Sequence, residues 1–426
     1  MIKLVPAQIN LNFLANISVY VVLAYVFSFI FFFPVGDGLL KEIMLLSSIL
    51  CISWRFQKRS WSFGETKYIV IPMAIYITVL IVSYLLYDGF MSTISMFLFS
   101  ILFLYSASLI KLRISFVAVI CLLSAFQTLD MVVDHLLHGT DRLAGTNNPI
   151  FLAMFTCLMS VLCFYLSLSV SGKFLRFSLW AGTSIFLLAT VLTETRGVII
   201  AYIPLLILMI YFVLKKVKFK LNVRSGMAFV LFSIILIDLA LHSDSLKVPF
   251  KTMKLELQEM LDESPKDEIY ITSVGFRILM WEFSWAVAQE HPLLGAGREG
   301  FYRYRQEWSE NGRFPSALGQ HLPETHAHSQ YFQELAMRGA VGLVALLGLF
   351  VMPAARGMRL LRADDNQRQC AGAILLSVVI AFATFALTEV SLKHSEKIAV
   401  FVALSFVALS LGQRSQSTSP VMATKE

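Results

Sequence analysis

Charged residues are scarce in this chain of 426 residues. Asp, Glu, Lys and Arg together make up only 15% of the sequence, whereas 57% is apolar and the mean hydropathy is +0.71. A water-soluble globular domain has about 25% charged residues, so this composition excludes that class of protein. The sequence predicts instead an all-α polytopic membrane protein, for which the bilayer is the solvent.

Cysteine is also scarce, and its positions exclude two kinds of structure. All five cysteines fall inside apolar runs, at Cys51, Cys121, Cys157, Cys163 and Cys370. A disulfide framework and a thiolate metal site are therefore not expected. The helical pattern His-Glu-x-x-His is missing as well, so we predict neither a metal site nor a cofactor.

Long apolar runs dominate what is present. A helix of about 20 apolar residues crosses a bilayer core of about 30 Å. We expect about 12 transmembrane helices, the second and tenth of them short, near residues 13–33, 39–54, 68–87, 91–110, 114–133, 149–171, 177–193, 197–214, 225–241, 339–355, 370–389 and 397–412. Nine lie within residues 1–241 and three within residues 339–412, separated by the one long polar segment, residues 242–338.

Basic residues gather in alternate connections between these spans. They include Arg55, Lys58, Lys111, Arg113, Lys173, Arg176, Lys215, Lys216, Arg356 and Arg359. The positive-inside rule places such connections in the cytoplasm. Residues 242–338 then form a large periplasmic loop at a bacterial inner membrane, and both termini face the cytoplasm. The first span is interpreted as a retained anchor, and residues 413–426 as a cytoplasmic tail.

The formal net charge of +7 is therefore explained by basic residues in the cytoplasmic connections and does not indicate nucleic-acid binding. We expect membrane lipids as partners and no nucleic acid.

The polar loop is expected to be a helical cap resting on the membrane. Met253, Leu257, Met260 and Leu261 recur at the spacing of an amphipathic helix. A second helix is expected over residues 273–289, carrying two tryptophans and ended by Pro292. A third is expected to begin near Thr325, as N-cap, and to end at residue 339, where the chain returns to the membrane.

His326 and His328 lie on this third helix in the prediction. Residues two apart on a helix point about 200° away from each other, so only one of them can face a site. We favour His328, because an imidazole of pKa about 6.5 can act as general base, a role worth about 10² to 10⁴ in rate. A His pair that merely decorates a membrane-surface helix fits the spacing equally well.

Arginines supply the cationic groups of the predicted site. Arg196 falls between two spans with no real loop, where a charge is expected to be paired or functional. Arg277 lies on the tryptophan-bearing helix, and Arg298 follows a glycine-containing turn. Because arginine binds phosphate oxygens in a bidentate fork, the three suggest a diphosphate clamp. Each arginine taken alone is better explained as a snorkelling interfacial residue. The remaining loop arginines are expected to be solvated or paired with nearby acids: Arg303, Arg305 and Arg313 with Glu307 and Glu310.

Asp130, Asp134 and His138 form a stripe at intervals of four residues near the outer end of the fifth span. They suggest a proton relay, as in a transporter, or an ordinary hydrated helix end. Glu389, Lys393 and His394 also fall at outer span ends, without a pattern that assigns them a role.

Several segments together resemble one family. They are residues 142–149 (Arg-Leu-Ala-Gly-Thr-Asn-Asn-Pro), residues 193–197 (Thr-Glu-Thr-Arg-Gly), residues 275–277 (Gly-Phe-Arg) followed by Trp281, residues 291–297 (His-Pro-Leu-Leu-Gly-Ala-Gly), and residues 326–329 (His-Ala-His-Ser) followed by Gly339 and Gly342. In this order and spacing the set resembles the O-antigen ligase and O-antigen polymerase superfamily, over roughly residues 140–350.

The resemblance implies a function and a set of site residues. Such proteins transfer a glycan from a polyprenyl diphosphate carrier to an acceptor hydroxyl on the periplasmic side, without a metal or a nucleotide sugar. Catalytic roles are implied for His328, Arg196 and Arg277. Substrate-binding roles are expected for Arg298, His326, Arg142 and Asn148. The chain departs from the family pattern at Ser329, where an Asn is usual, and at Thr195, where a Ser is usual.

We therefore expect an inverting, metal-independent O-antigen ligase that moves glycan from undecaprenyl diphosphate to a sugar hydroxyl of lipid A-core. The choice over a polymerase, which uses the same donor, rests on the single dominant outer loop. A transporter or flippase using Asp130, Asp134 and Arg196 is a further alternative, although paired broken helices and repeat symmetry are missing from the sequence. A structural or sensory membrane protein would leave the histidines and arginines unexplained.

Overall fold

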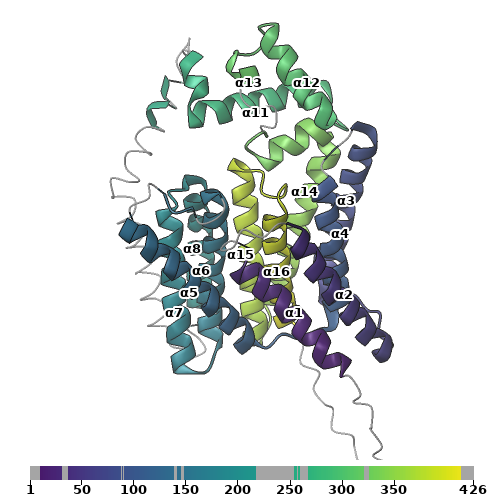
Figure 1. The fold of residues 1–426 in the computed structure, drawn as a ribbon, viewed down its shortest axis with the longest axis vertical. Helices are drawn as coiled ribbons and strands as arrows, with labels where there is room; N and C mark the ends of the chain where they lie inside the picture. Colours follow the sequence, from purple (N-terminus) through teal and green to yellow (C-terminus); the bar gives the residue numbers. More distant parts are fainter. Residues whose placement is uncertain are drawn as a thin grey trace, which may run out of the picture.

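The computed structural model describes residues 10–30, 37–87, 89, 91–138, 142–144, 148–216, 254–256, 258–259, 267–320 and 326–413. Within these residues all regular secondary structure is helical, which confirms the predicted all-α class. Most helices run side by side in one bundle, and a smaller group lies across one end of it (Figure 1).

The bundle is built from α1 (Leu11–Ser28), α2 (Asp37–Lys58), α3 (Lys67–Tyr87), α4 (Met91–Ser106), α5 (Ile114–His138), α6 (Pro149–Ser169), α7 (Lys173–Leu192), α8 (Arg196–Lys216), α14 (Gln330–Leu361), α15 (Asn366–Thr388) and α16 (Ser395–Leu411). The group across the end holds α11 (Ser273–Glu290), α12 (Gly297–Glu310) and α13 (Ala317–Gln320), preceded by the 3-10 helix η4 (Asp267–Ile271). We call α11, α12 and α13 the cap. Two further 3-10 turns are η1 (Gly64–Thr66) and η2 (Ala107–Leu109).

Nine helical segments among the described residues are long and apolar enough to cross a membrane: Leu11–Ser28, Gly64–Tyr87, Met91–Leu109, Ile114–His138, Pro149–Ser169, Lys173–Leu192, Arg196–Lys215, Gln330–Leu361 and Asn366–Thr388. The predicted second span lies in α2, which also carries Lys41, Glu42 and Arg55. The twelfth corresponds to α16, with 17 residues. The ninth, residues 225–241, lies outside the described residues, so the count of twelve stays a prediction.

The centre of the bundle is formed by α6, α15 and α16, whose side chains are mostly buried. These helices are apolar on every face, as expected for helices surrounded by other helices and not by lipid. Outer helices such as α3 and α8 bury only part of their surface and leave apolar side chains exposed to the bilayer. The candidate site lies beneath the cap, where α6 and α8 begin and α15 ends.

The segment between α11 and α12 docks onto α14 by backbone contact. Ala296 N donates to Ala336 O at 2.9 Å, and Ala340 N donates to Pro292 O at 2.8 Å. Gly339 breaks the helical geometry of α14 with φ 62° and ψ −158°, and its Cα faces the backbone of Leu293. Only glycine fits there, because a Cβ would overlap the Leu293 carbonyl and φ is positive. This contact fixes the cap on the bundle.

One prediction about the loop is wrong, and one of its helices was not predicted. The third loop helix does not include residues 326–329, because α14 begins at Gln330 with Ser329 as its N-cap, and His328 has a left-handed φ of 51°. A helix was not predicted over residues 297–310, where α12 lies. The expected second helix, residues 273–289, is confirmed as α11, with the Thr272 hydroxyl capping its first turn. The expected helix near Met253 lies largely outside the described residues.

Candidate active site

A cavity of about 390 Å³ opens between α6, α8, α11 and α15. Three arginines line it, Arg142, Arg196 and Arg277, together with Trp281 and Glu389. Its wall toward the bundle is apolar and includes Ile150, Met154, Val198, Ile200 and Phe385. The cavity therefore combines a cationic rim with an apolar side that faces the membrane-spanning helices.

Arg196 and Arg142 are held by the turn that joins α7 to α8. Arg196 is the first residue of α8, and Arg142 donates from Nε and Nη2 to the carbonyl of Thr193 at 3.0 and 2.9 Å. The next residue, Gly197, lies against Thr388, so α8 and α15 approach closely here. The charge of Arg196 interacts with those of Arg142 and Arg277.

Arg277 and Trp281 lie one turn apart on α11, and each has a buried donor. Arg277 Nη1 donates to the Ser273 hydroxyl at 2.9 Å, but its Nε and the Nε1 of Trp281 reach no acceptor among the described residues. Burial lowers the pKa of Arg277, an effect that the carboxylate of Glu389 partly offsets. Buried donors without an acceptor are costly, so both are suited to a ligand oxygen.

Glu389 connects the arginines to the histidines. It follows α15 directly, lines the cavity, and lies with Oε1 3.5 Å from His326 Nε2 and 3.7 Å from Lys397 Nζ. Burial would raise its pKa, but the nearby Lys397, His326 and His328 hold that pKa below its ordinary value. Glu389 is thus ionised and balances part of the local positive charge.

His326 and His328 face each other instead of pointing apart. Their ring centroids are 4.4 Å apart, because the chain between them is not helical. His328 N donates to His326 Nδ1 at 3.1 Å, so the proton of a neutral His326 lies on Nε2, toward Glu389. Burial lowers the pKa of His326 to about 3, so this imidazole is neutral near pH 7.

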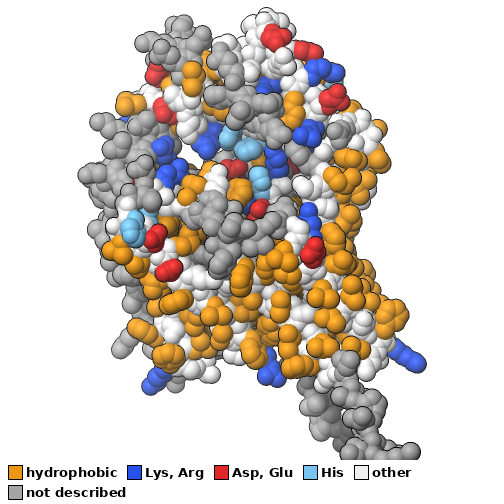
Figure 2. All heavy atoms as spheres, viewed as in Figure 1, with side chains coloured by type: hydrophobic (Ala, Val, Ile, Leu, Met, Phe, Trp, Pro, Cys, Tyr) orange, Lys and Arg blue, Asp and Glu red, His pale blue; other side chains and the backbone are white. Residues whose placement is uncertain are grey.

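His328 is positioned by α11. Its ring contacts Phe276 edge-to-face with centroids 5.9 Å apart, and Phe276 precedes Arg277 on that helix. Neither histidine lines the cavity itself; they adjoin it through Glu389. Figure 2 shows basic, acidic and histidine side chains gathered on this face below the cap, above a band of hydrophobic side chains.

The other predicted site residues have different contacts. Asn148 caps α6, accepting from Ile150 N at 2.9 Å, and does not line the cavity. Arg298 also lies outside the cavity lining, with Nη1 3.5 Å from the carbonyl of Gly89. The structure therefore groups Arg142, Arg196, Arg277 and the two histidines, but not Arg298 and Asn148.

The remaining predicted polar residues lie elsewhere. Arg303 forms the expected pair with Glu307 at 3.7 Å, whereas Arg313 pairs with Glu290 and Arg305 is buried beside the ring of Tyr302. His138 Nδ1 lies 2.8 Å from Asp134 Oδ1, and both side chains are exposed on α5. No group of three or more His, Cys, Asp or Glu in the described part of the chain is placed to hold a metal ion.

Glu389, Lys397 and the free donor of Trp281 are site features that the sequence did not reveal. Glu389 was visible only as a charge at the end of an apolar run, one of several such charges. The position of Glu389 in the site depends on how α15 packs against α8 and on how residues 326–329 pack against the end of α15. No local sequence pattern encodes these contacts.

Residues 181–347 match the sequence model of the family described as O-antigen ligase. The match covers the cavity-lining Arg196 and Arg277 together with both histidines, and it confirms the resemblance found from the motifs. It covers less than half of the chain.

A protein of Haemophilus influenzae described as uncharacterized is 26% identical to this chain over 99 residues. The matched stretch covers 23% of this chain and 24% of that protein. The chain therefore matches about a quarter of the length of this relative.

Proposed function

We propose that this protein is an O-antigen ligase that transfers a glycan from undecaprenyl diphosphate to a sugar hydroxyl of lipid A-core. One observation carries the proposal: three arginines converge on one cavity beside the His326 and His328 pair, and two donors there, Arg277 Nε and Trp281 Nε1, reach no acceptor among the described residues. Such a rim suits a diphosphate, which offers several anionic oxygens. The apolar wall suits the first isoprene units of a prenyl chain.

The proposed division of the site puts the leaving group and the base on different sides of the reacting carbon. The diphosphate occupies the cavity, and the acceptor approaches from the histidine side, past Glu389. His328 removes the proton of the acceptor hydroxyl as its oxygen bonds to the anomeric carbon. The bond from that carbon to the diphosphate oxygen breaks with its electron pair, so the configuration inverts.

Arg196 and Arg277 stabilise the charge that grows on the departing diphosphate. Loss of one preorganised donor of this kind typically costs about 10² to 10³ in rate. Arg142 is proposed to bind the same diphosphate. His326, neutral and turned toward Glu389, is proposed to position His328 and not to titrate during the reaction.

The experiment uses a bacterial strain lacking the gene, complemented with variants and scored by polymer-capped lipopolysaccharide. His328→Ala is expected to abolish capping while the protein still inserts into the membrane. His138→Ala is the matched control, since His138 is exposed on α5, and it is expected to support normal capping. Normal capping by His328→Ala would refute the proposed base.

The same strain separates a ligase from a polymerase. Loss of a ligase leaves long carrier-linked chains, whereas loss of a polymerase leaves lipid A-core with at most one repeat. Purified protein with carrier-linked glycan and lipid A-core, with and without a chelator, tests the reaction and its metal independence directly. Movement of the carrier across reconstituted vesicles without a new glycosidic bond would indicate a transporter instead.

A further inference from the structure

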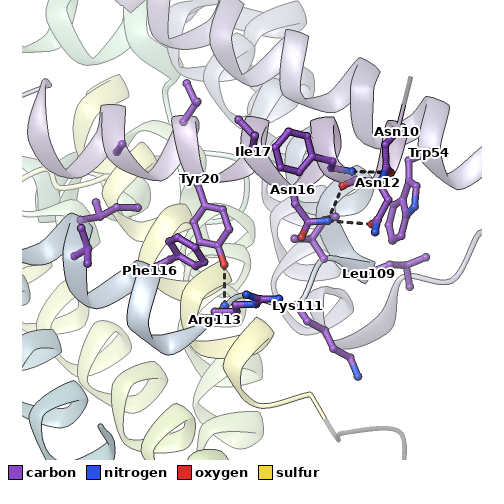
Figure 3. A pocket seen from close by; sticks show the side chains of 16 residues that line it. Asn10, Asn12, Asn16, Ile17, Tyr20, Trp54, Leu109, Lys111, Arg113 and Phe116 are labelled. Atoms are coloured by element: carbon purple, nitrogen blue, oxygen red, sulfur yellow. Dashed lines mark hydrogen bonds between the residues drawn. The ribbon is translucent and has the colours of Figure 1, made fainter. Parts of the chain in front are cut away.

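A second cavity of about 830 Å³ lies at the other end of the bundle, between the first half of α1 and the start of α5 (Figure 3). The helix α5 begins at this cavity and has 25 residues. Its last residue, His138, is four residues before Arg142 of the candidate active site. A helix of that length spans about 37 Å. The two cavities are therefore distinct.

One side of this cavity is apolar and exposed. Phe13, Ile17 and Val21 of α1 are between 42 and 60% exposed, and Phe116 and Val119 of α5 are 51 and 48% exposed. All five line the cavity. On helices that cross a membrane, such side chains contact acyl chains, so this side opens to lipid.

The other part of the cavity is polar and basic. Lys111 and Arg113 line it, and three asparagines of α1 join them: Asn10, Asn12 and Asn16. Tyr20 fixes the connection before α5, since its hydroxyl accepts from Arg113 N at 2.8 Å (Figure 3). The described residues that line the cavity include no Asp or Glu, so the cavity favours an anion.

Trp54 gives an independent sign of a ligand. Its side chain lines the cavity and is only 8% exposed, yet its Nε1 reaches no acceptor among the described residues. Figure 3 shows the indole beside Asn10 and Asn12 at the polar part of the cavity. A buried indole N–H normally has a partner, and a ligand oxygen would supply one.

We propose that this cavity binds one anionic phospholipid. Its phosphate lies at Lys111 and Arg113, an oxygen of its headgroup or ester accepts from Trp54 Nε1, and its acyl chains lie along α1 and α5. A phospholipid is the occupant that matches an amphiphilic cavity whose apolar side opens to the bilayer. The positive-inside rule predicts that this end faces the cytoplasm, where anionic lipids attract basic residues.

The test measures lipid retention by native mass spectrometry of the full-length protein in detergent. Phosphatidylglycerol and phosphatidylcholine with the same acyl chains are added in separate titrations. The wild type is expected to retain one phosphatidylglycerol in preference to phosphatidylcholine. The double variant Lys111→Gln/Arg113→Gln is expected to bind it about 30-fold more weakly, since each cation near the surface contributes about fivefold.

Two further variants make the result specific. Lys58→Gln/Lys173→Gln removes two exposed cations predicted to lie on the same side but outside the cavity, and it is expected to retain the lipid as the wild type does. Trp54→Phe removes the Nε1 donor together with the pyrrole ring that carries it, and it is expected to weaken retention while the protein stays folded. A rise in melting temperature with phosphatidylglycerol, lost in Lys111→Gln/Arg113→Gln, provides a second readout.

Equal retention by the two double variants would overturn the proposal, as would equal retention of phosphatidylcholine and phosphatidylglycerol. Soluble glycerol phosphate tests whether the cavity binds a free phosphate compound and not a lipid headgroup. It is expected not to displace the lipid, and displacement would show a site for a free phosphate compound instead.

Discussion

His326 Nε2 lies 3.5 Å from Glu389 Oε1, although one residue precedes α14 and the other follows α15. Because His328 N donates to the opposite ring nitrogen of His326, the two contacts fix the orientation of this imidazole. Lys397 Nζ lies 3.7 Å from the same carboxylate oxygen and is 2% exposed. Glu389 thus faces the Nε2 of the neutral His326 and is also the counter-charge of the buried Lys397.

We expect Glu389→Gln to lower glycan transfer by about 10² and also to destabilise the protein. The activity falls because His326 and, through it, His328 lose their orientation, which removes part of a general-base contribution of about 10² to 10⁴. Stability falls because the buried Lys397 is left without its counter-charge. Turnover and thermal unfolding of the purified variant measure both effects.

The double variant Glu389→Gln/Lys397→Met is the control. It removes both charges, so we expect it to recover stability but not activity. If recovery of stability also restored transfer, Glu389 would have a structural role only.

Acid is expected to destabilise the protein through His326. Its pKa is about 3 in the folded protein, below the ordinary value of about 6.5 that applies when it is unfolded. As the pH falls below 6.5, His326 is protonated in the unfolded chain but stays neutral in the folded protein. The free energy of unfolding therefore falls until about pH 3. The slope reaches at most about 1.4 kcal/mol per pH unit.

His326→Gln tests this between pH 6.5 and 5, above the range in which Glu389 titrates. We expect thermal unfolding of the variant to depend less on pH than that of the wild type. His138→Gln, at an exposed position, is expected to keep the wild-type slope. A wild-type slope in His326→Gln would show that another group is responsible.

The sequence predicted the parts of this structure that local patterns encode. α11 extends over residues 273–290, close to the predicted 273–289, because Thr272 can cap it and Pro292 cannot continue it. Arg196 and Arg277 were expected at one site, because arginine binds phosphate oxygens and the two residues fall between two spans and on the tryptophan-bearing helix. The cavity that both line agrees with that placement.

The parts of the fold and of the site that the sequence did not predict depend on contacts between segments distant in the sequence. A positive φ at His328 has no signature in a run of His-Ala-His-Ser, so the helical geometry predicted there placed the two imidazoles on opposite sides. Arg298 follows a glycine turn as predicted, but that turn docks on α14 and directs α12 away from the cavity lining. Helix docking of this kind is set by backbone contact, which sequence periodicity does not report.

Arg277→Lys is expected to lower the rate of transfer by about 10² to 10³. Lysine keeps the charge but loses the planar fork and the Nε donor that reaches no acceptor among the described residues. Arg303→Lys is the matched control, because Arg303 is exposed and pairs with Glu307 at 3.7 Å. Equal rates for the two variants would contradict the proposed diphosphate contact.

Trp281→Phe tests the second donor. Phenylalanine keeps a ring that can stack on Phe332, whose centroid lies 5.7 Å away, but removes Nε1. A hydrogen bond to a charged group is worth about 1.5–3 kcal/mol, so we expect the KM for the carrier-linked glycan to rise by about 10- to 100-fold. A change in kcat alone would place the indole outside the diphosphate contact.

Gly339→Ala is expected to detach the cap from α14 and so to lower both stability and transfer. The residue has φ 62° and lies against the Leu293 backbone, so an alanine meets backbone strain and a carbonyl that cannot rotate away. Strain of this kind costs of order 1–3 kcal/mol. Gly348→Ala, on the same helix with nothing within 4 Å of the added Cβ, is expected to keep both properties.

Because Arg277 and Phe276 are carried by the cap, loss of transfer in Gly339→Ala should come with increased proteolysis of residues 291–297. Lost transfer with an unchanged proteolytic pattern would mean that the Gly339 contact does not position the site.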